Sequence, residues 1–542
     1  MKTSKLLWLL LVPATALALI TQILYGHLGF NPTDEGFILA MSRRILDGQL
    51  PHRDFISIRP ALSPLLHVPE VWLGGNYTFY LSRFLARLQV ALSCFLWALI
   101  FFRQFRLPDS WRVSWVLLSG FISYLFSTYY FNLMAWHTLD GLFLVTVGFF
   151  LVSESRWRIA GYFVLGLSCL TKQNFLAVPL AVWLITDIRR PYLLIIALVP
   201  SILYLSFIIY GGGAQFLWQQ LSSETSLLET GIFRYLANFW FWGGMAAIAV
   251  PAFILRHRPR LTGWFFYDLW ILLMLFLCAA MFYGKYETKP AFLLAGCFTS
   301  AVILYGIKND WQSPATKTAI IVLVTGWTAS ISVGMNTPVL FAGPLLAGLF
   351  LLTASIFQLS FNPTFYYGRL RKGILVLLLL ISAMTYHEAR LRNIYRDLPA
   401  RQLQYSLDGV LPGAAGIYTN STTYHFLKNL TDVAENAGFR TIAVLPETPA
   451  FWVKHSQLNP MSLDWPAGLE VQNSSILQRL KNDLDSLPEG SWVLAQKYQA
   501  APLSFTKEPL DSQLQKYGII TYLRLHWQIE HESDYFRIYT RR

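Results

Sequence analysis

The chain has 542 residues, of which 54% are hydrophobic and only 13% are charged. Together with a mean hydropathy of +0.43, this composition excludes an ordinary soluble domain and predicts several membrane-spanning segments. The formal net charge of +13 does not indicate a nucleic-acid-binding protein, because the basic residues gather in short loops between apolar runs, as in the positive-inside pattern. We therefore expect the lipid bilayer, and no nucleic acid, as a partner.

The apolar runs predict about 13 membrane-spanning helices, since each crossing needs about 20 apolar residues. Lys2 and Lys5 precede the first run, so a cleaved signal peptide is an alternative there. The many later runs favour a retained membrane anchor instead. The predicted spans are residues 6–25, 79–102, 113–130, 138–153, 157–171, 174–187, 191–210, 236–255, 263–282, 290–306, 318–336, 338–358 and 373–386.

The loops between the predicted spans differ in charge, and this difference predicts the topology. If the N-terminus is cytoplasmic, every strongly basic loop lies on the cytoplasmic side, and an odd number of spans places the C-terminus outside. We expect a multi-pass protein of the cell (inner) membrane, with residues 1–387 as the transmembrane domain and residues 26–78 as a large first external loop. The basic loops are residues 103–112, 154–158, 187–190, 256–260, 308–317 and 368–372.

The first external loop contains two adjacent acids, Asp34 and Glu35, at the start of an expected helix. One interpretation is structural, because the helix dipole favours acids in a first turn and Asn31 suits the N-cap. The other is functional, because charge at a membrane boundary is expensive and usually has a role. The following segment, residues 43–55, predicts an amphipathic interfacial helix that ends at Gly48.

A second polar pair, His137 and Asp140, lies at the outer end of a predicted span. The spacing of three residues places both side chains on one helical face. A helix cap or a side chain that reaches the headgroup region is the simpler interpretation. Together with Glu35, the pair would also suit a divalent metal. The sequence has no diagnostic metal spacing, so the cofactor is left unknown.

Several cations also lie on the predicted outer face. Lys172 interrupts two apolar runs, Arg59 follows the first-loop turn, Arg83 lies near the outer end of a span, and Lys285 lies in a short polar loop. Each of these residues alone would suit lipid headgroups or, for Lys172, the carbonyl end of a helix. Together they place an excess of positive charge around a few acids, which is what a site for a lipid-linked phosphate needs.

The composition changes after about residue 387 and predicts a small α/β domain outside the membrane. Residues 416–420 and 491–498 indicate strands, and residues 441–446 indicate a buried strand that a proline ends. Residues 421–439 have the pattern of an amphipathic helix that ends at Gly438. The last 25 residues resemble a terminal hairpin, so residues 388–542 form the second expected domain.

The segment DEGFILAMSRRILDGQLPHRDF (34–55), followed by Arg59-Pro60, resembles the first external loop of GT-C membrane glycosyltransferases. The closest group is that of bacterial protein O-mannosyltransferases and aminoarabinose lipid A transferases. Residues 166–174, with their lysine turn, and residues 443–465, in the C-terminal part, are also similar to members of this group. The resemblance implies a GT-C fold, a polyprenyl-phosphate sugar donor and an acceptor on the extracytoplasmic side.

The resemblance also implies roles for single residues. The family's first-loop acid corresponds to Asp34, and a second acid corresponds to Asp140 in less typical surroundings. Metal dependence differs among the relatives and is not implied. Because glycosyl transfer needs a base for the acceptor hydroxyl and a cation for the leaving phosphate, we expect Asp34 as the base, with Glu35 assisting it.

The phosphate-binding residues that we expect are Arg59, Lys172, Lys285 and Arg83. Single displacement predicts inversion at the sugar, and the acceptor (protein, lipid or glycan) is unidentified. One alternative is a polytopic transporter or lipid flippase without transfer activity, although the chain shows no internal repeat of the kind that many transporters have. A polytopic receptor or assembly factor without catalytic activity is another alternative.

Overall fold

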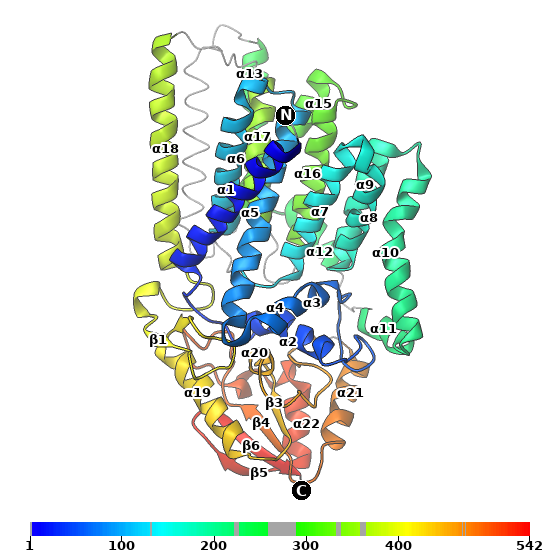
Figure 1. Cartoon of the computed structure of the whole chain (residues 1–542), viewed down its shortest axis with the longest axis vertical. Helices are drawn as coiled ribbons and strands as arrows, with labels where there is room; N and C mark the ends of the chain where they lie inside the picture. The colour runs from blue at the N-terminus through cyan, green and yellow to red at the C-terminus, as the bar shows by residue number, and fades with distance from the viewer. Residues whose placement is uncertain are drawn as a thin grey trace.

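The computed structural model describes residues 3–129, 133–221, 227–257, 289–331, 338–357, 365–468, 470–471 and 473–541. Most of these residues are helical, and a small sheet lies near the C-terminus. The long helices form a bundle at one end of the molecule, and the sheet domain occupies the other end (Figure 1). The structure is thus mostly helical with a small sheet region near the C-terminus, as the sequence predicts.

The bundle consists of helices that run alternately toward and away from the sheet domain (Figure 1). Short loops join many of these helices, so neighbours in the sequence pack antiparallel. Their bounds are α1 (Thr3–Tyr25), α5 (Thr78–Gln104), α6 (Arg112–Thr128), α7 (His137–Ser153), α8 (Arg158–Cys169), α9 (Ala177–Val182), α10 (Pro191–Tyr210), α11 (Ala214–Leu221), α12 (Leu227–Leu236), α13 (Phe239–His257), α15 (Lys289–Asn309), α16 (Pro314–Ser330), α17 (Ala342–Ile356) and α18 (Phe365–Arg392).

Five helices among the described residues are long and apolar enough to cross a membrane, and a sixth span results if the bent pair of α7 and α8 is counted as one. A membrane protein is therefore supported, but the count of about 13 spans is not confirmed. The predicted segment 263–282 lies outside the described residues, and every other predicted segment contains a helix. The five helices are Trp8–Tyr25, Gly75–Gln104, Pro191–Tyr210, Lys289–Asn309 and Val339–Ile356.

The basic segments 103–112, 154–158, 187–190, 308–317 and 368–372 lie at the end of the bundle that is remote from the sheet domain (Figure 1), and most of segment 256–260 lies outside the described residues. Two ion pairs connect these loops: Arg103 pairs with Glu154, and Arg158 pairs with Asp187 at 3.2 Å. All four residues lie at or next to helix ends that face away from the C-terminal domain. One face of the bundle therefore carries the basic loops that suggested the topology.

Residues 26–78, the predicted first external loop, form a layer between the bundle and the C-terminal domain (Figure 1). It contains α2 (Asp34–Leu46), α3 (Leu62–Leu66) and α4 (Val68–Leu73). The helix expected to end at Asp47-Gly48 is α2, which has Asp47 as its C-cap, and ten of its 13 residues are buried. Its Arg44 is one of them and forms a two-pronged pair with Asp464 of the C-terminal domain, with both distances 2.8 Å.

The closest approach between the first loop and the C-terminal domain is at Gly36. A Cβ added there would lie 2.0 Å from the Ala450 nitrogen in α20 (Pro449–Trp452). The Ala450 N–H also donates to the Pro32 carbonyl at 3.2 Å. The absence of a side chain at Gly36 thus allows two backbones to touch, and this contact fixes how α2 sits on the domain.

Replacing Gly36 with alanine is expected to destabilise the protein by about 1–3 kcal/mol, because the added methyl group must push α2 and α20 apart. Thermal unfolding followed by tryptophan fluorescence measures the effect. Gly243→Ala is the matched control, since its added Cβ meets only Leu293 Cδ1 at 3.9 Å. An equal thermal stability of the two variants would contradict the proposed contact.

The C-terminal domain is built on a four-stranded sheet with the order β3-β4-β6-β5. Strands β3 (Ile442–Leu445) and β4 (Trp492–Gln496) are parallel, while β6 (Phe536–Arg541) runs antiparallel to β4 and to β5 (Trp527–Glu532). A parallel pair needs a crossover, and α21 (Ser474–Asp485) lies between β3 and β4 in the chain. A separate small pair is formed by β1 (Tyr405–Ser406) and β2 (Tyr418–Thr419).

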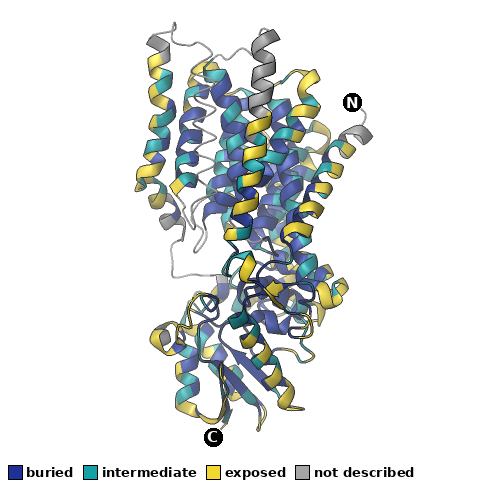
Figure 2. Ribbon diagram, turned by 90° about the vertical axis from the view of Figure 1, so that its left-hand side faces the viewer, coloured by how far each residue is buried: buried dark blue, intermediate teal, exposed yellow. Residues whose placement is uncertain are grey.

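The predicted elements of the C-terminal domain are largely confirmed. The helix expected over residues 421–439 is α19 (Ser421–Asn436), and its N-cap Asn420 accepts a hydrogen bond from the Thr423 N–H. Both strand predictions around 441–446 and 491–498 are correct, and the terminal hairpin is β5 with β6. The prediction missed α21 and also α22 (Gly518–His526), which occupies the start of the segment taken for the hairpin. Buried residues fill the interior of both parts of the molecule (Figure 2).

Candidate functional site

Asp34 begins α2 and is buried in the layer between the bundle and the C-terminal domain, with 3% of its surface exposed. The Asn31 carboxamide oxygen accepts from the Asp34 N–H at 3.0 Å, so the expected cap is present. The Asp34 carboxylate itself accepts from Arg396 at 2.7 Å and from the Tyr395 hydroxyl at 2.9 Å. It is therefore not used as the helix cap, and its role lies in the interior of the molecule.

The protonation of Asp34 is set by opposing influences. Burial raises the pKa of the Asp34 carboxyl, while the positive charge of Arg396 and the hydrogen bond from Tyr395 lower it, and the net direction is upward from the ordinary value. A carboxylate with a raised pKa is a stronger base than one in water. The site thus combines a more basic carboxylate with a fixed orientation.

Glu35, the next residue, faces a different partner. Its carboxylate accepts two hydrogen bonds from Arg83, one from Nε at 2.9 Å and one from a terminal nitrogen. The remaining Arg83 donors reach the carbonyls of Gly26 and Gly29, at 2.8 Å and 2.5 Å, and of Leu28 at 3.3 Å. An arginine has five N–H donors, so Arg83 has none left for a phosphate. We therefore remove Arg83 from the expected phosphate-binding residues and assign Glu35 and Arg83 to the framework.

Asp140 lies in the first turn of α7 and also has fixed partners. Its carboxylate accepts from His67 Nε2 at 3.1 Å and from the Gln89 amide at 3.1 Å. The other nitrogen of His67 is 2.6 Å from Glu70. Burial alone would lower the pKa of His67, but the two carboxylates raise it well above the ordinary value. A charged imidazole thus binds the first loop to the start of α7.

His137 begins α7 and has both ring nitrogens buried without a hydrogen-bond partner among the described residues. Its surface is 3% exposed, and the backbone of Thr171 is near the ring without forming a hydrogen bond of ordinary geometry. Buried polar groups in native proteins are nearly always paired. Because burial and two nearby cations keep the imidazole neutral, His137 offers one N–H donor at a helix N-terminus, where the dipole is positive.

Two of the predicted cations lie near His137. After burial, the positive charges of Arg59 and Lys172 are what most disfavours protonation of the His137 imidazole. Arg59 lies over the ring of Phe37, with 5.4 Å from the guanidinium carbon to the ring centre, and Phe37 also packs edge-on against His137 at 5.8 Å. Since Phe37 is three residues after Asp34, both side chains lie on one face of α2. The face of α2 that carries Asp34 therefore also contacts Arg59 and His137 through Phe37.

Lys172 occupies a buried position just outside α8. Its ammonium group donates to the Ile331 carbonyl at 2.5 Å, and the Asn174 amide reaches the same oxygen at 2.7 Å. Ile331 is the C-cap of α16, so the lysine does lie at the carbonyl end of a helix, although not of the expected one. Burial lowers the pKa of Lys172 to about 7, and the charge of Arg59 acts in the same direction. An anion placed between Lys172 and Arg59 would relieve this repulsion.

A second acid, Glu470, completes the candidate site. It pairs with Arg59 at 3.3 Å, and its surface is 5% exposed. Burial raises the pKa of Glu470, Arg59 opposes this shift, and the negative charge of Asp34 adds to it. The two carboxylates are therefore close enough to influence each other, and the C-terminal domain contributes directly to the site.

The predicted residues thus separate into three groups. Asp34, His137, Arg59 and Lys172 belong to one buried layer, whereas Glu35, Arg83 and Asp140 are held in framework pairs. Lys285 lies outside the described residues. Within the described ranges, no three histidine, cysteine or acidic side chains are grouped as metal ligands. The suggested set of Glu35, His137 and Asp140 therefore does not converge on a metal.

Three residues of the site could not be identified from the sequence. Arg396 and Tyr395 follow α18, more than 350 positions from Asp34, and Glu470 is 411 positions from Arg59. The framework residue His67 was also missed, although its three-residue spacing to Glu70 is a local signal that could have indicated that pair. Long-range partners of this kind leave no local pattern.

Comparison of the chain with protein-family models, with curated proteins and with solved structures finds no match.

Proposed function

We propose that the protein is a membrane glycosyltransferase that moves a sugar from a polyprenyl-phosphate donor to an acceptor on the extracytoplasmic side. The observation that carries this proposal is the unpaired, buried His137 beside Arg59 and Lys172, on the same side of α2 as the buried base Asp34. An anion site next to a buried carboxylate is what transfer from a lipid phosphate needs. Its place between apolar helices and a polar domain suits a donor with a lipid tail and a polar head.

The phosphate is proposed to bind at the N-terminus of α7. Arg59, Lys172 and His137 supply donors there, and the helix dipole adds positive potential. The anion would accept from the single N–H of the neutral His137 ring and would compete with Glu470 for Arg59, which lies 3.3 Å from that carboxylate. The charges of Arg59 and Lys172 would neutralise the charge that develops on the leaving phosphate.

The reaction then follows from the positions of the acid and the cations. The acceptor hydroxyl oxygen forms a bond to the anomeric carbon, and the bond from that carbon to the phosphate oxygen breaks. The proton of the hydroxyl passes to the Asp34 carboxylate, and the bonding electrons leave with the polyprenyl phosphate. One displacement inverts the anomeric configuration. Arg396 and Tyr395 hold Asp34 in place and keep enough of it ionised to act as a base.

The topology is part of the same proposal. About 13 spans, a cytoplasmic N-terminus and a C-terminal domain outside the cell (inner) membrane would place the α2 layer at the outer boundary. The gathering of basic loops at the opposite end of the bundle supports this orientation. Lys285 could join the phosphate site only from a segment outside the described residues.

A transfer assay tests the proposed function directly. Full-length protein in nanodiscs is incubated with polyprenyl-phosphate sugars and with protein, lipid and glycan acceptors, and mass spectrometry detects the new glycosidic bond. Formation of an inverted product supports the proposal. Movement of the lipid-linked sugar across proteoliposomes without any new bond would instead support the transporter or flippase alternative.

The pH dependence of donor use provides a second test. Because the pKa of Lys172 is lowered to about 7, its charge is present below that pH and is lost as the pH rises through it. We expect kcat/KM for the donor to fall above about pH 7, since this parameter reports on the free enzyme. Lys172→Arg should remove this alkaline decline, because arginine stays charged.

Steady-state kinetics from pH 5.5 to 9, as working limits around the Lys172 pKa, measure the profile. Lys497→Arg, at a surface lysine that pairs with Glu532, is the control and should keep the wild-type curve. The same alkaline decline in Lys172→Arg as in the wild type would remove Lys172 from the phosphate site.

A further inference from the structure

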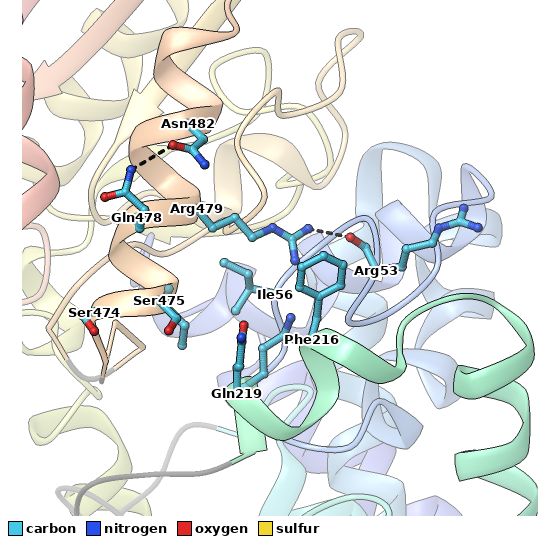
Figure 3. A pocket seen from close by; sticks show the side chains of 11 residues that line it. Arg53, Ile56, Phe216, Gln219, Ser474, Ser475, Gln478, Arg479 and Asn482 are labelled. Atoms are coloured by element: carbon cyan, nitrogen blue, oxygen red, sulfur yellow. Dashed lines mark hydrogen bonds between the residues drawn. The ribbon is translucent and has the colours of Figure 1, made fainter.

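A groove of about 670 Å³ lies between α11, the first external loop and α21 (Figure 3). Its volume is within the range of about 300–1,000 Å³ that small-molecule sites occupy. Three separate parts of the chain contribute to it: the bundle, the loop and the C-terminal domain. Its lining includes Arg53, Ile56, Phe216, Gln478, Arg479 and Asn482.

The polar lining of the groove is made mostly of amides and hydroxyls. Gln478 and Asn482 are exposed on one face of α21 and are joined by a hydrogen bond of 3.0 Å. Ser474 and Ser475 are exposed at the start of the same helix. Amides and hydroxyls both donate and accept hydrogen bonds, as the hydroxyl groups of a sugar do. Among the residues that the structure describes, no acidic side chain lines the groove.

The two arginines of the groove do not make it an anion site. Arg53 pairs with its neighbour Asp54 at 2.8 Å. Arg479 donates to the backbone carbonyls of His52 at 3.1 Å and Arg53 at 2.6 Å, so it holds the loop in place. The donors of both guanidinium groups thus already have acceptors, namely Asp54 and two backbone carbonyls. An uncharged polar ligand therefore suits the groove better than a phosphate.

The groove also has an apolar part. Phe216 lies under the Arg479 guanidinium, with 5.0 Å from its carbon to the ring centre, and Ile56 lies beside them (Figure 3). A sugar ring has an apolar face of C–H groups and a polar rim of hydroxyls. Ile56 is buried and forms the floor of the groove, so the half-buried Phe216 is the apolar side chain that is left to meet the C–H face of a sugar, with amides and hydroxyls around it.

The groove is connected with the candidate site through two segments of chain. The first segment runs from Arg53 and Ile56 in the groove to Arg59, and the second runs from Glu470 to Ser474 and α21. Arg59 and Glu470 form a pair at 3.3 Å. The two segments therefore line the groove at one end and join the charged site at the other.

We propose that the groove binds the saccharide part of the acceptor, as an uncharged oligosaccharide, and directs it toward Asp34. This inference rests on the proposed function, because it supplies the substrate for the same site. The acceptor would then be a glycan or a glycan-bearing molecule, whereas the transfer chemistry alone requires only a hydroxyl group.

Saturation-transfer NMR on full-length protein in nanodiscs tests this inference without the donor. The probes are maltotetraose, chitotetraose and mannotetraose, with sorbitol as a polyol that has no ring. We expect at least one tetrasaccharide, and not sorbitol, to bind with a dissociation constant on the order of millimolar. The double variant Gln478→Ala/Asn482→Ala should weaken this binding about five- to tenfold, because it removes hydrogen bonds to sugar hydroxyls.

The control is Gln528→Ala, which removes an exposed amide from β5 at the other edge of the sheet. It should leave saccharide binding unchanged. No binding of any tetrasaccharide, or equal binding by the double variant, would overturn the inference. Saccharide binding without any sugar transfer would refute the proposed function and keep the groove as a saccharide site.

Discussion

Asp34→Asn is expected to reduce sugar transfer by about 10²- to 10⁴-fold, the usual contribution of a general base. Asparagine keeps the size of the side chain and can still accept from Tyr395 and Arg396, but it cannot take the proton of the acceptor hydroxyl. Since burial already raises the pKa of Asp34, replacing the carboxylate removes a desolvation penalty as well as the attraction to Arg396. The fold should therefore persist while the activity is lost.

The measurement is the initial rate of product formation, with thermal unfolding of the same preparation to verify folding. Asp47→Asn is the matched control, because Asp47 is the C-cap of the same helix and forms an ion pair with Arg43 near the surface. It should retain nearly full activity. An unchanged rate in Asp34→Asn would remove the assigned base and, with it, the proposed mechanism.

Arg83→Met is expected to destabilise the protein by roughly 3–5 kcal/mol, because it leaves the buried Glu35 carboxylate without its partner. Arg83 has no exposed surface, and it also loses hydrogen bonds to three backbone carbonyls between α1 and α2. Because Arg83 has a structural role, the variant should unfold at a lower temperature than the wild type, and the protein that remains folded should keep its activity. Thermal unfolding in detergent, followed by tryptophan fluorescence, measures this change.

Two further variants make the test of the Arg83 pair specific. Glu35→Gln combined with Arg83→Met should recover part of the lost stability, since no unpaired charge then remains buried. Arg43→Met, which breaks a pair with partly exposed members, should change the stability by less than about 1 kcal/mol. If Arg83→Met were no more destabilising than Arg43→Met, the framework role of Arg83 would be wrong.

Hydropathy and periodicity predicted most of the fold because these signals are local. Apolar runs indicated the helices of the bundle, and alternation with turn residues indicated β3, β4 and the β5–β6 hairpin. The end of α2 was predicted correctly, but the burial of Arg44 was not, because its partner is distant in the sequence. Arg44 resembles a surface residue in the sequence, and only the fold places Asp464 beside it.

The candidate site was predicted only in part, for a related physical reason. The sequence identified Asp34, Arg59 and Lys172 as charged residues in the right region, but adjacent residues on a helix point about 100° apart, so the two acids of the first loop face different surroundings. Arg83 was predicted as a phosphate ligand because the sequence does not show the acceptors that its donors already have. The partners Tyr395 and Arg396 come from a turn whose path depends on the whole bundle.

The Arg44–Asp464 pair also has a consequence for biosynthesis. Its two members are 420 positions apart, and at about 5–20 residues per second a ribosome needs about 20–80 s to make the chain between them. Throughout that interval, the C-terminal residues that bury Arg44 and the other buried residues of α2 have not yet been synthesised. Synthesis of the chain must therefore be nearly complete before this layer can form. A chain truncated before Asp464 would keep Arg44 without its partner and would expose the apolar residues of α2.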